Sequence, residues 1–420
     1  ISMQHVVLIN NSHVENFSVR YLSAYLKDRG IRVSTLHFES TKDDVFQLLS
    51  AESLQQLAMY CRECDLVGIS LLTTHHLNRS IQISNYLKER IQAKIIWGGV
   101  PVVCDPEFYL QYADYICAGE GETVIENLLH GEKKDDIKGL GYHDPTGNCV
   151  INPVPDLIDI NTIPIPHLDL DDGFVFSREH LQPLKDELPK SLTTYHVISV
   201  RGCPYNCSYC LNGTLKKVYS GKGRYFQTVE VERIIRELEW AQENIPHLKR
   251  IVIPDDDFFL RPEPEIEQLL TMYAQRIQVP IFYLQTSVAH VTEAKVRLLK
   301  ESKVQLRYLK IGLQSASPRI CGSIFHRPFD PQLFISKLRL LAEHDIPVML
   351  DIISDNPYEE LSDKYESVQF LWSIIKQVKG ISNLDQPIRM HDHKLMFFPG
   401  SQLYAMAKKD GLISDDYIQR

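Results

Sequence analysis

Short apolar strands alternate with amphipathic helical patterns in two separate parts of the chain, and this alternation limits the available folds more than any other feature. Strand candidates in the first part lie at 5–10, 31–38, 66–70, 95–97 and 115–118. Those in the second part lie at 197–200, 251–254, 281–285, 308–312, 348–353 and 394–398. Strands spaced by helices form βαβ units, which build parallel sheets covered by helices. The chain is therefore predicted to be α/β.

The two parts are separated by a segment of different character. Residues 151–194 carry six prolines and little periodicity, which indicates an extended linker. At about 100–200 residues per domain, 420 residues suit two or three domains. We predict a flavodoxin- or Rossmann-like domain over 1–150, the linker over 151–194, a partial (β/α)6 barrel of the TIM type over 195–400, and a C-terminal helical segment over 401–420.

Composition and charge exclude several function classes. No apolar run approaches the ~20 residues of a membrane-spanning helix, and the run 6–9 is too short for a signal-peptide core. We therefore expect a cytoplasmic protein without a membrane partner. The formal net charge is −9, so nucleic acid is an unlikely partner.

Cys203, Cys207 and Cys210 stand within eight residues, directly after a predicted strand. Three thiolates this close together can hold one metal centre, and an iron–sulfur cluster usually takes four. Three would leave one iron open for a substrate or cofactor. The alternative is a zinc knuckle, which would need a fourth ligand at similar spacing, or neighbouring cysteines without a metal.

The C-x3-C-x2-C spacing, with Tyr209 before the last cysteine, resembles the signature of the radical S-adenosylmethionine (SAM) enzymes. The resemblance implies that the three cysteines hold a [4Fe–4S] cluster. It also implies that the open iron binds SAM, which is cleaved to methionine and a 5′-deoxyadenosyl radical.

Further segments of the second part resemble the SAM-contacting motifs of that family. They are the acidic run that ends at Asp257, the segment 312–315, His326-Arg327 and the segment 351–357, which departs from the commoner Gly-rich version. The residues that the resemblance implies as SAM contacts are Tyr209, Asp257, Gln314, Ser315, Arg327 and Ile353.

Two segments of the first part resemble the S-x-L and G-G signatures of cobalamin-binding domains. A serine at a strand end can bond the nucleotide tail, and paired glycines allow close backbone approach. Gly119-Glu120-Gly121-Glu122 also matches cobalamin domains that are fused to radical SAM barrels. The alternative is a flavodoxin-like domain that binds nothing. The candidate cobalamin residues are Asn10, Ser70, Leu71, Leu72, Thr73, Gly98, Gly99, Val100, Gly119, Glu120, Gly121 and Glu122.

The third cobalamin signature, D-x-H-x-x-G, is missing after the first strand. His13 stands there without the aspartate and glycine of that motif. We therefore expect His13 to be a loop residue and cobalamin to bind base-off, without a histidine below the cobalt.

Together these motifs resemble the cobalamin-dependent radical SAM enzymes, and most closely their class B methyltransferases. The resemblance implies methyl transfer from SAM, via methylcobalamin, to an unactivated carbon or phosphorus of a small molecule or a peptide side chain. It also implies a reducing partner such as flavodoxin or ferredoxin. The alternatives are a rearrangement or ring formation without methylation, and a cobalamin- or SAM-sensing protein. His391-Asp392-His393 is a candidate to face the substrate.

Overall fold

The computed structural model describes residues 4–11, 16–38, 48–177, 179–378, 380–383, 385 and 387–414. The chain divides into two compact units. The first consists of 1–192, 214–225 and 398–420, and the second of 193–213 and 226–397. Each unit has its own sheet, so the two are described separately.

The first unit is built on a mixed sheet that, among the described residues, has nine strands in the order β7-β6-β5-β4-β3-β1-β2-β8-β9. The strands are β1 (His5–Asn10), β2 (Arg32–Phe38), β3 (Leu66–Ser70), β4 (Lys94–Gly98), β5 (Tyr115–Cys117), β6 (Leu140–His143), β7 (Cys149–Ile151), β8 (Gly173–Ser177) and β9 (His180–Pro183). Strands β1 to β5 are parallel to one another. Their order 5-4-3-1-2 is that of the flavodoxin-like fold, which confirms the prediction for this part.

Helices connect these parallel strands. They are α1 (Phe17–Asp28), α2 (Ala51–Tyr60), α3 (Leu77–Lys88), α4 (Val100–Cys104) and α5 (Pro106–Leu110). Helix α6 (Gly121–Leu129) lies between β5 and the antiparallel β6, α7 (Leu184–Ser191) follows β9, and α14 (Gln402–Lys409) follows β17. Asn16 begins α1 by accepting a bond from the backbone N–H of Ser18, a standard N-cap contact.

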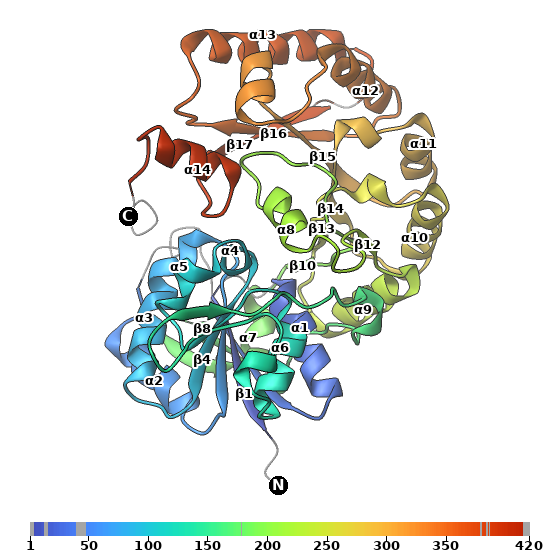
Figure 1. Cartoon of the computed structure of the whole chain (residues 1–420). Helices are drawn as coiled ribbons and strands as arrows, with labels where there is room; N and C mark the ends of the chain where they lie inside the picture. Colours follow the sequence, from blue (N-terminus) through green and yellow to red (C-terminus); the bar gives the residue numbers. More distant parts are fainter. Residues whose placement is uncertain are drawn as a thin grey trace. The chain divides into compact units, whose positions relative to one another are not determined.

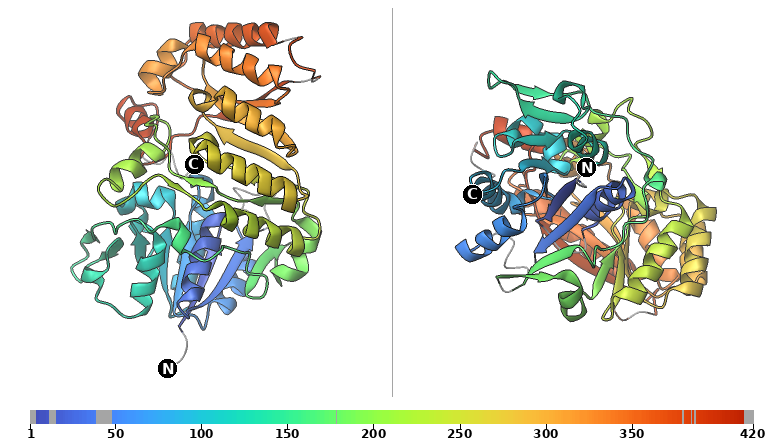
Figure 2. Two further views of the ribbon diagram at one scale, coloured as in Figure 1. Left: turned by 90° about the vertical axis from the view of Figure 1, so that its right-hand side faces the viewer. Right: turned by 90° about the horizontal axis from the view of Figure 1, so that it is seen from below.

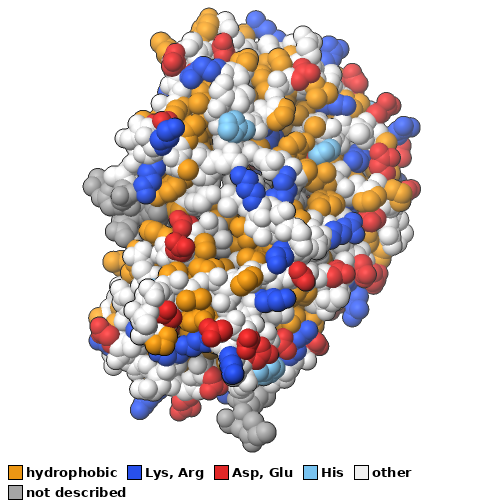
Figure 3. Space-filling view, in the orientation of Figure 1, with side chains coloured by type: hydrophobic (Ala, Val, Ile, Leu, Met, Phe, Trp, Pro, Cys, Tyr) orange, Lys and Arg blue, Asp and Glu red, His pale blue; other side chains and the backbone are white. Residues whose placement is uncertain are grey.

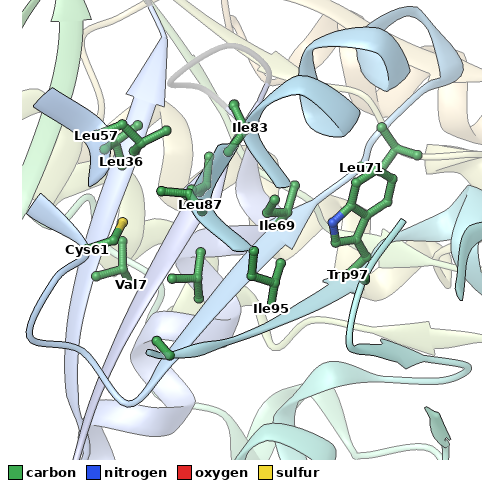
Figure 4. Close-up of a cluster of buried hydrophobic side chains, with 14 of the residues drawn as sticks. Val7, Leu36, Leu57, Cys61, Ile69, Leu71, Ile83, Leu87, Ile95 and Trp97 are labelled. Atoms are coloured by element: carbon green, nitrogen blue, oxygen red, sulfur yellow. The ribbon is translucent and has the colours of Figure 1, made fainter. Parts of the chain in front are cut away.

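The core of the first unit lies between the sheet and helices α2 and α3 (Figure 4). Alternate residues of each strand enter it because successive side chains of a strand point to opposite faces. Its members include Val7, Leu36, Leu57, Ile69, Leu71, Ile83, Leu87, Ile95 and Trp97, all between 0% and 1% exposed. Each such side chain contributes about 1.5–3 kcal/mol of burial free energy, which holds the strand ends in place.

The second unit contains a parallel sheet that has, in the described part of the chain, six strands in the order β10-β13-β14-β15-β16-β17. The strands are β10 (Thr194–His196), β13 (Arg250–Ile253), β14 (Ile281–Thr286), β15 (Leu306–Gln314), β16 (Val348–Ser354) and β17 (Ile388–Lys394). Two short strands that pair antiparallel, β11 (Val200–Arg201) and β12 (Gln227–Thr228), lie between β10 and β13 in the sequence. This is the predicted partial (β/α)6 barrel.

Helices lie along one side of the second sheet (Figures 1 and 2). They are α9 (Val231–Asn244), α10 (Glu263–Arg276), α11 (Glu293–Glu301), α12 (Pro331–Glu343) and α13 (Leu361–Val378). Helix α8 (Asn212–Val218) follows the cysteines in the sequence, and from residue 214 onward it belongs to the first unit. Helix α9 buries one apolar stripe, which is formed by Val231, Ile234, Ile235, Leu238 and Ala241.

Two segments differ from the expectation drawn from the sequence. The segment 151–194 is more than a linker, because β8 joins the sheet beside β2, β9 pairs with β8, and α7 follows. The last strand of the second sheet spans 388–394 rather than 394–398. Its side chains are mostly exposed, so the strand lacks the apolar pattern by which strands are recognised. The predicted domain boundaries themselves stay a prediction.

The surface carries charges of both signs. Lys and Arg side chains are interspersed with Asp and Glu on the face shown in Figure 3. Among the described residues, no helix combines the length and apolar character needed to cross a membrane.

Candidate functional site

The predicted cobalamin residues gather at the carboxyl edge of the first sheet. Asn10, Ser70 and Gly98 end three neighbouring strands and are register partners, Asn10 with Ser70 and Ser70 with Gly98. Strands β1 and β3 flank the point where the strand order reverses, and ligands of such folds bind in the crevice outside this point. The structure therefore brings together three residues that are far apart in the sequence.

Polar contacts organise this edge. Asn10 is fully buried, and its amide bonds His37 Nδ1 at 3.0 Å and accepts from Asn16 Nδ2 at 3.1 Å. Ser70 is half-buried, and its Oγ lies 3.3 Å from Ser18 Oγ. Asn10 thus links the N-terminal end of α1 to β1. Ser70 is partly exposed at the carboxyl edge of the sheet.

The fold requires glycine at position 99 but not at position 98. Gly99 has φ +112°, and a Cβ there would lie 2.1 Å from the carbonyl oxygen of Leu71, so the fold itself requires glycine. A Cβ on Gly98 would meet only Cys117, at an ordinary 3.5 Å. The chain does not need glycine at 98, which fits a cofactor that approaches the backbone there.

Some of the remaining candidate cobalamin residues lie at the carboxyl edge of the first sheet, and others are buried inside the first unit. Leu72 is 40% exposed, Thr73 Oγ1 bonds His75 Nδ1 at 3.2 Å, and Val100 begins α4. Glu120 is 5% exposed, and its Oε2 accepts from the backbone N–H of Ile158 at 2.7 Å.

The segment after β5 is packed from within the chain. A Cβ on Gly119 would lie 3.0 Å from Pro155, whereas one on Gly121 would make only ordinary contacts. Glu122 and the fully buried Leu71 also face the interior. The segment 119–122 therefore anchors residues 155–158, a role that the sequence pattern did not reveal. His13 lies outside the described residues.

The three cysteines of the second unit lie in one compact loop. The loop turns between Cys207 and Cys210, where the backbone N–H of Cys210 donates to the Cys207 carbonyl at 3.1 Å. Ser208 fastens it, because its N–H donates to the carbonyl of Phe325 at 2.9 Å and its hydroxyl to that of Ile324. All three thiols are free of disulfides.

Burial alone would keep the thiols of Cys203 and Cys210 protonated. It raises the pKa of Cys203 to about 12 and that of Cys210 to about 11. Only thiolates bind metals, so a metal must offset the cost of their deprotonation. The donor set of three soft thiolates in eight residues fits a [4Fe–4S] cluster with one open iron.

Arg327 links this loop to the end of β15. Its Nη1 lies 3.7 Å from Cys207 Sγ, and its Nη2 donates to the carbonyl of Gly312 at 2.9 Å. The guanidinium also lies 5.9 Å from the centre of the Tyr205 ring. A fixed positive charge at this point can hold an anionic group beside the cysteines.

The end of β15 is distorted in a way that is common beside functional sites. The register with β16 shifts between Gly312 and Gln314, and Gln314 has φ +70°. A non-glycine residue in this region is strained, and such strain is often retained for function. The Gln314 amide folds back over Gly312, since a Cβ on that glycine would lie 2.6 Å from Gln314 Nε2.

The other predicted SAM contacts lie around this point with their own partners. Ser315 is buried, and its Oγ accepts a hydrogen bond from the backbone N–H of Ser317 at 3.2 Å. Ile353 is the second-last residue of β16. Tyr209 packs its ring edge-on against Phe325 at 4.9 Å between centres. Burial raises the pKa of Tyr209 well above its usual value, so the phenol stays neutral.

Asp257 is fully buried, and both its oxygens are engaged. Oδ1 accepts from Thr286 Oγ1 at 2.6 Å, and Oδ2 lies 2.6 Å from His290 Nδ1. His290 is the more exposed partner and lies against Tyr205, with ring centres 6.0 Å apart. Asp257 thus orients His290, which the sequence did not single out because its partner stands 33 residues away.

Asp255 ties the cysteine loop to the sheet. Its carboxylate accepts from the backbone N–H groups of Ser199 at 2.7 Å and Val200 at 3.0 Å, and from the Ser199 hydroxyl. Burial raises the pKa of Asp255 to about 6, and the donors of Ser199 and Val200 limit that rise. This acid sets the position of the strand that leads into Cys203.

Comparisons with known proteins assign both units. Residues 11–129 match the model of the B12 binding domain, and residues 197–371 match that of the radical SAM superfamily. Among curated proteins, an uncharacterized methyltransferase of Pyrococcus horikoshii is 24% identical over 315 residues, which cover 73% of this chain and 63% of that protein. The anaerobic magnesium-protoporphyrin IX monomethyl ester cyclase of Cereibacter sphaeroides is 22% identical, over 84% of this chain and 56% of the cyclase. The chain therefore spans about three fifths of the length of these two relatives.

Two solved structures share the whole fold. The methyltransferase TsrM of Kitasatospora setae, with tryptophan and a SAM analogue bound, superposes with a TM-score of 0.72 at 16% identity. The match covers 97% of this chain and 76% of TsrM. The cobalamin-dependent SAM radical enzyme OxsB superposes with a TM-score of 0.73 at 17% identity, over 99% of this chain and 62% of OxsB.

These matches agree with the two clusters of residues described above. The two matched models are named for cobalamin (B12) and SAM, and the loop of three cysteines fits a [4Fe–4S] cluster. The chain therefore combines an N-terminal domain that matches the B12 binding domain with a C-terminal domain that matches the radical SAM superfamily.

Proposed function

We propose that this chain is a class B methyltransferase that transfers the methyl group of SAM, by way of cobalamin, to an unactivated carbon or a phosphorus atom. The observation that carries the proposal is the presence in one chain of both clusters, the Cys203–Cys210 loop with Arg327 and the Asn10–Ser70–Gly98 edge. When bound, the three cofactors supply the radical and methyl-transfer chemistry. Relatives named methyltransferases support this reading.

The residues of the chain have defined tasks in this proposal. Cys203, Cys207 and Cys210 hold the cluster, and Arg327 places a positive charge beside Cys207 for the carboxylate of SAM. Gly98 lets the backbone approach the corrin tail. The cofactors provide the reactivity, and the protein provides binding and orientation.

We infer the contacts of the other predicted residues in the same way. Tyr209, Asp257, Gln314, Ser315 and Ile353 are proposed SAM neighbours. Asp257 would act through His290, because both of its oxygens are already engaged. The proposed substrate is a small molecule or a peptide side chain. The proposed electron donor is a flavodoxin or a ferredoxin, and the proposed location is the cytoplasm.

A second function has a specific observation in its favour. The cyclase of Cereibacter sphaeroides aligns over 84% of this chain, and its name describes ring formation rather than methyl transfer. The rival proposal is therefore a cobalamin-dependent radical SAM enzyme that closes a ring without methylation.

One experiment separates the two. The full chain, purified without oxygen and reduced, is incubated with cobalamin, SAM that carries a CD3 group, and a metabolite extract. Methyl transfer to carbon predicts S-adenosylhomocysteine from the SAM that gives its methyl group, 5′-deoxyadenosine from the SAM whose radical takes the substrate hydrogen, CD3-labelled cobalamin, and a product in which one labelled methyl group replaces that hydrogen. Ring closure predicts 5′-deoxyadenosine without label in cobalamin or product.

Cysteine variants provide the control for this experiment. Replacement of Cys203, Cys207 and Cys210 by Ala should abolish formation of 5′-deoxyadenosine, whereas the exposed Cys149→Ala should not. No SAM cleavage by the wild type under any of these conditions would refute both functions and favour a cofactor-sensing protein.

A further inference from the structure

Asp351, His391 and His393 form a cluster on the second sheet, and none of the three is among the six residues proposed above as SAM contacts, although Asp351 begins the segment 351–357. Asp351 Oδ1 lies 3.0 Å from His391 Nδ1 and 3.2 Å from His393 Nε2. The ligand atoms of the three side chains all lie within 4.8 Å of one another. Two imidazole nitrogens therefore converge on a single carboxylate oxygen.

Strand register builds this cluster. Asp351 on β16 is the partner of His391 on β17, and Ile353 is the partner of His393. His391 and His393 are two residues apart on one strand, so their side chains share a face. Asp392, between them, points the other way and accepts from Ser354 Oγ at 3.0 Å.

Lys310 fixes the carboxylate from the neighbouring strand. Its Nζ lies 3.0 Å from Asp351 Oδ2 and 5.1 Å from the centre of the Tyr283 ring. The lysine engages one oxygen of Asp351 and leaves the other to the imidazoles. Contacts of this kind orient the carboxylates that bind metal ions.

The two distances from Asp351 Oδ1 to the imidazole nitrogens suit adjacent ligands on one ion. Ligands about 2.0–2.2 Å from a metal, at angles of about 90–110°, lie roughly 2.9–3.5 Å from each other. The distances of 3.0 Å and 3.2 Å fall in this range. Two imidazoles and a carboxylate form a donor set that suits divalent first-row transition metals.

The exposure of the three residues indicates an open site. Asp351 is 9% exposed at the side chain, whereas His391 and His393 are 47% and 45% exposed. Sites that bind or activate a small molecule keep three protein ligands and an open position. Gly312, whose carbonyl Arg327 contacts, pairs with Asp351 one strand away. Neighbouring strands lie about 4.8 Å apart, so the cluster is close to the end of β15.

We propose that Asp351, His391 and His393 bind one divalent transition metal ion of the zinc type, with at least one coordination position open to water or a polar group of the substrate. This site is separate from the cysteine cluster. It does not rest on the proposed methyl transfer, because metal binding is measured without a substrate.

Zinc is the probe, since it is distinct from the iron of the cluster and the cobalt of cobalamin. The full chain with its cofactors, purified without oxygen, is dialysed against Zn²⁺ with a competing chelator. Metal content is then measured by mass spectrometry and affinity by calorimetry. We expect one zinc per chain beyond the iron and cobalt, and a rise in unfolding temperature with zinc concentration.

Variants locate the ion. His391→Ala, His393→Ala and Asp351→Asn should each weaken zinc binding at least about tenfold. The exposed His247→Ala on the same unit should not change it. The triple Ala variant of Cys203, Cys207 and Cys210 should retain the zinc, which excludes binding by the thiols.

Two outcomes would overturn the proposal. One is a wild type without stoichiometric zinc, which would mean that the cluster is a hydrogen-bonded ion-pair network satisfied by Lys310. The other is undiminished zinc in a folded His391→Ala/His393→Ala double variant. Unfolding temperatures in the absence of zinc, equal to that of the wild type, establish that the variants are folded.

Discussion

The two adjacent glycines at the end of β4 differ in what the chain requires of them. Gly99 has a positive φ and no room for a Cβ, so any substitution there strains the fold. Gly98 has room for a methyl group beside Cys117. Substitution of Gly98 can therefore test cofactor binding without disturbing the fold, whereas substitution of Gly99 would affect both.

Gly98→Ala should weaken cobalamin binding at least about tenfold and change the free energy of unfolding by less than about 1 kcal/mol. The reason is that the new methyl group is tolerated by the chain but occupies the surface where the corrin tail approaches. Titration with hydroxocobalamin, followed by absorbance, measures the affinity.

Gly30→Ala is the matched control for this prediction. Gly30 has φ +75° with open space around it, so Ala there costs about 1–2 kcal/mol of stability and should leave cobalamin affinity unchanged. If Gly98→Ala binds cobalamin like the wild type, the residues of this edge are misassigned.

Asp255 is the residue whose loss should most disturb the approach to the cysteine loop. In Asp255→Asn one oxygen can still accept from the backbone N–H groups of Ser199 and Val200, but an NH2 group replaces Oδ2, which accepts from the Ser199 hydroxyl. We expect the free energy of unfolding to fall by about 1–3 kcal/mol, because this buried hydroxyl loses its acceptor. Denaturant titration of the full chain measures this loss. Asp330→Asn, at the N-cap of α12, keeps a good cap and should cost far less.

At the level of elements, the sequence predicts the helices and strands that bury a regular set of apolar side chains. The predicted bounds of β1 and β3 agree with the structure because both strands bury mostly aliphatic side chains. Strand β17 was predicted six residues too late because its exposed side chains give no apolar signal. The His391–His393 face is visible only once register places Asp351 opposite.

The distorted end of β15 offers a prediction at this scale. Gln314→Gly should raise the free energy of unfolding by about 1 kcal/mol, since glycine adopts φ +70° without strain. The same change should weaken SAM binding about tenfold, because the amide that folds over Gly312 is lost. Calorimetry with SAM and thermal unfolding provide the two measurements.

Lys303→Gly relieves the same kind of strain at an exposed turn, where φ is +58°. It should stabilise the chain by a similar amount and leave SAM binding unchanged. Equal SAM affinity in Gln314→Gly and the wild type would show that the bulge serves packing alone.

At the scale of the molecule, the motifs predict which residues share a unit but not how each site is supported. The cysteine spacing and the paired glycines point to the two cofactor sites. The contacts Arg327–Cys207, Asp257–His290 and Glu120–Ile158 depend on tertiary packing across 120, 33 and 38 residues. Such separations leave no local pattern in a single sequence.

The division into two units, each with its own sheet, predicts that the two metal cofactors load independently. The chain purified without oxygen should contain about four irons and four sulfides, since three cysteines form the one thiolate loop. The triple Ala variant of Cys203, Cys207 and Cys210 should lose this iron and its charge-transfer absorbance but still bind cobalamin with unchanged affinity. Gly98→Ala should show the reverse, with full iron and weakened cobalamin, because a Cβ there meets only Cys117 of the first unit. Iron, sulfide and cobalamin are measured on the same preparations, and Cys149→Ala serves as the cysteine control. Joint loss of both cofactors in a variant that remains folded would mean that the two sites depend on each other, which contradicts this prediction.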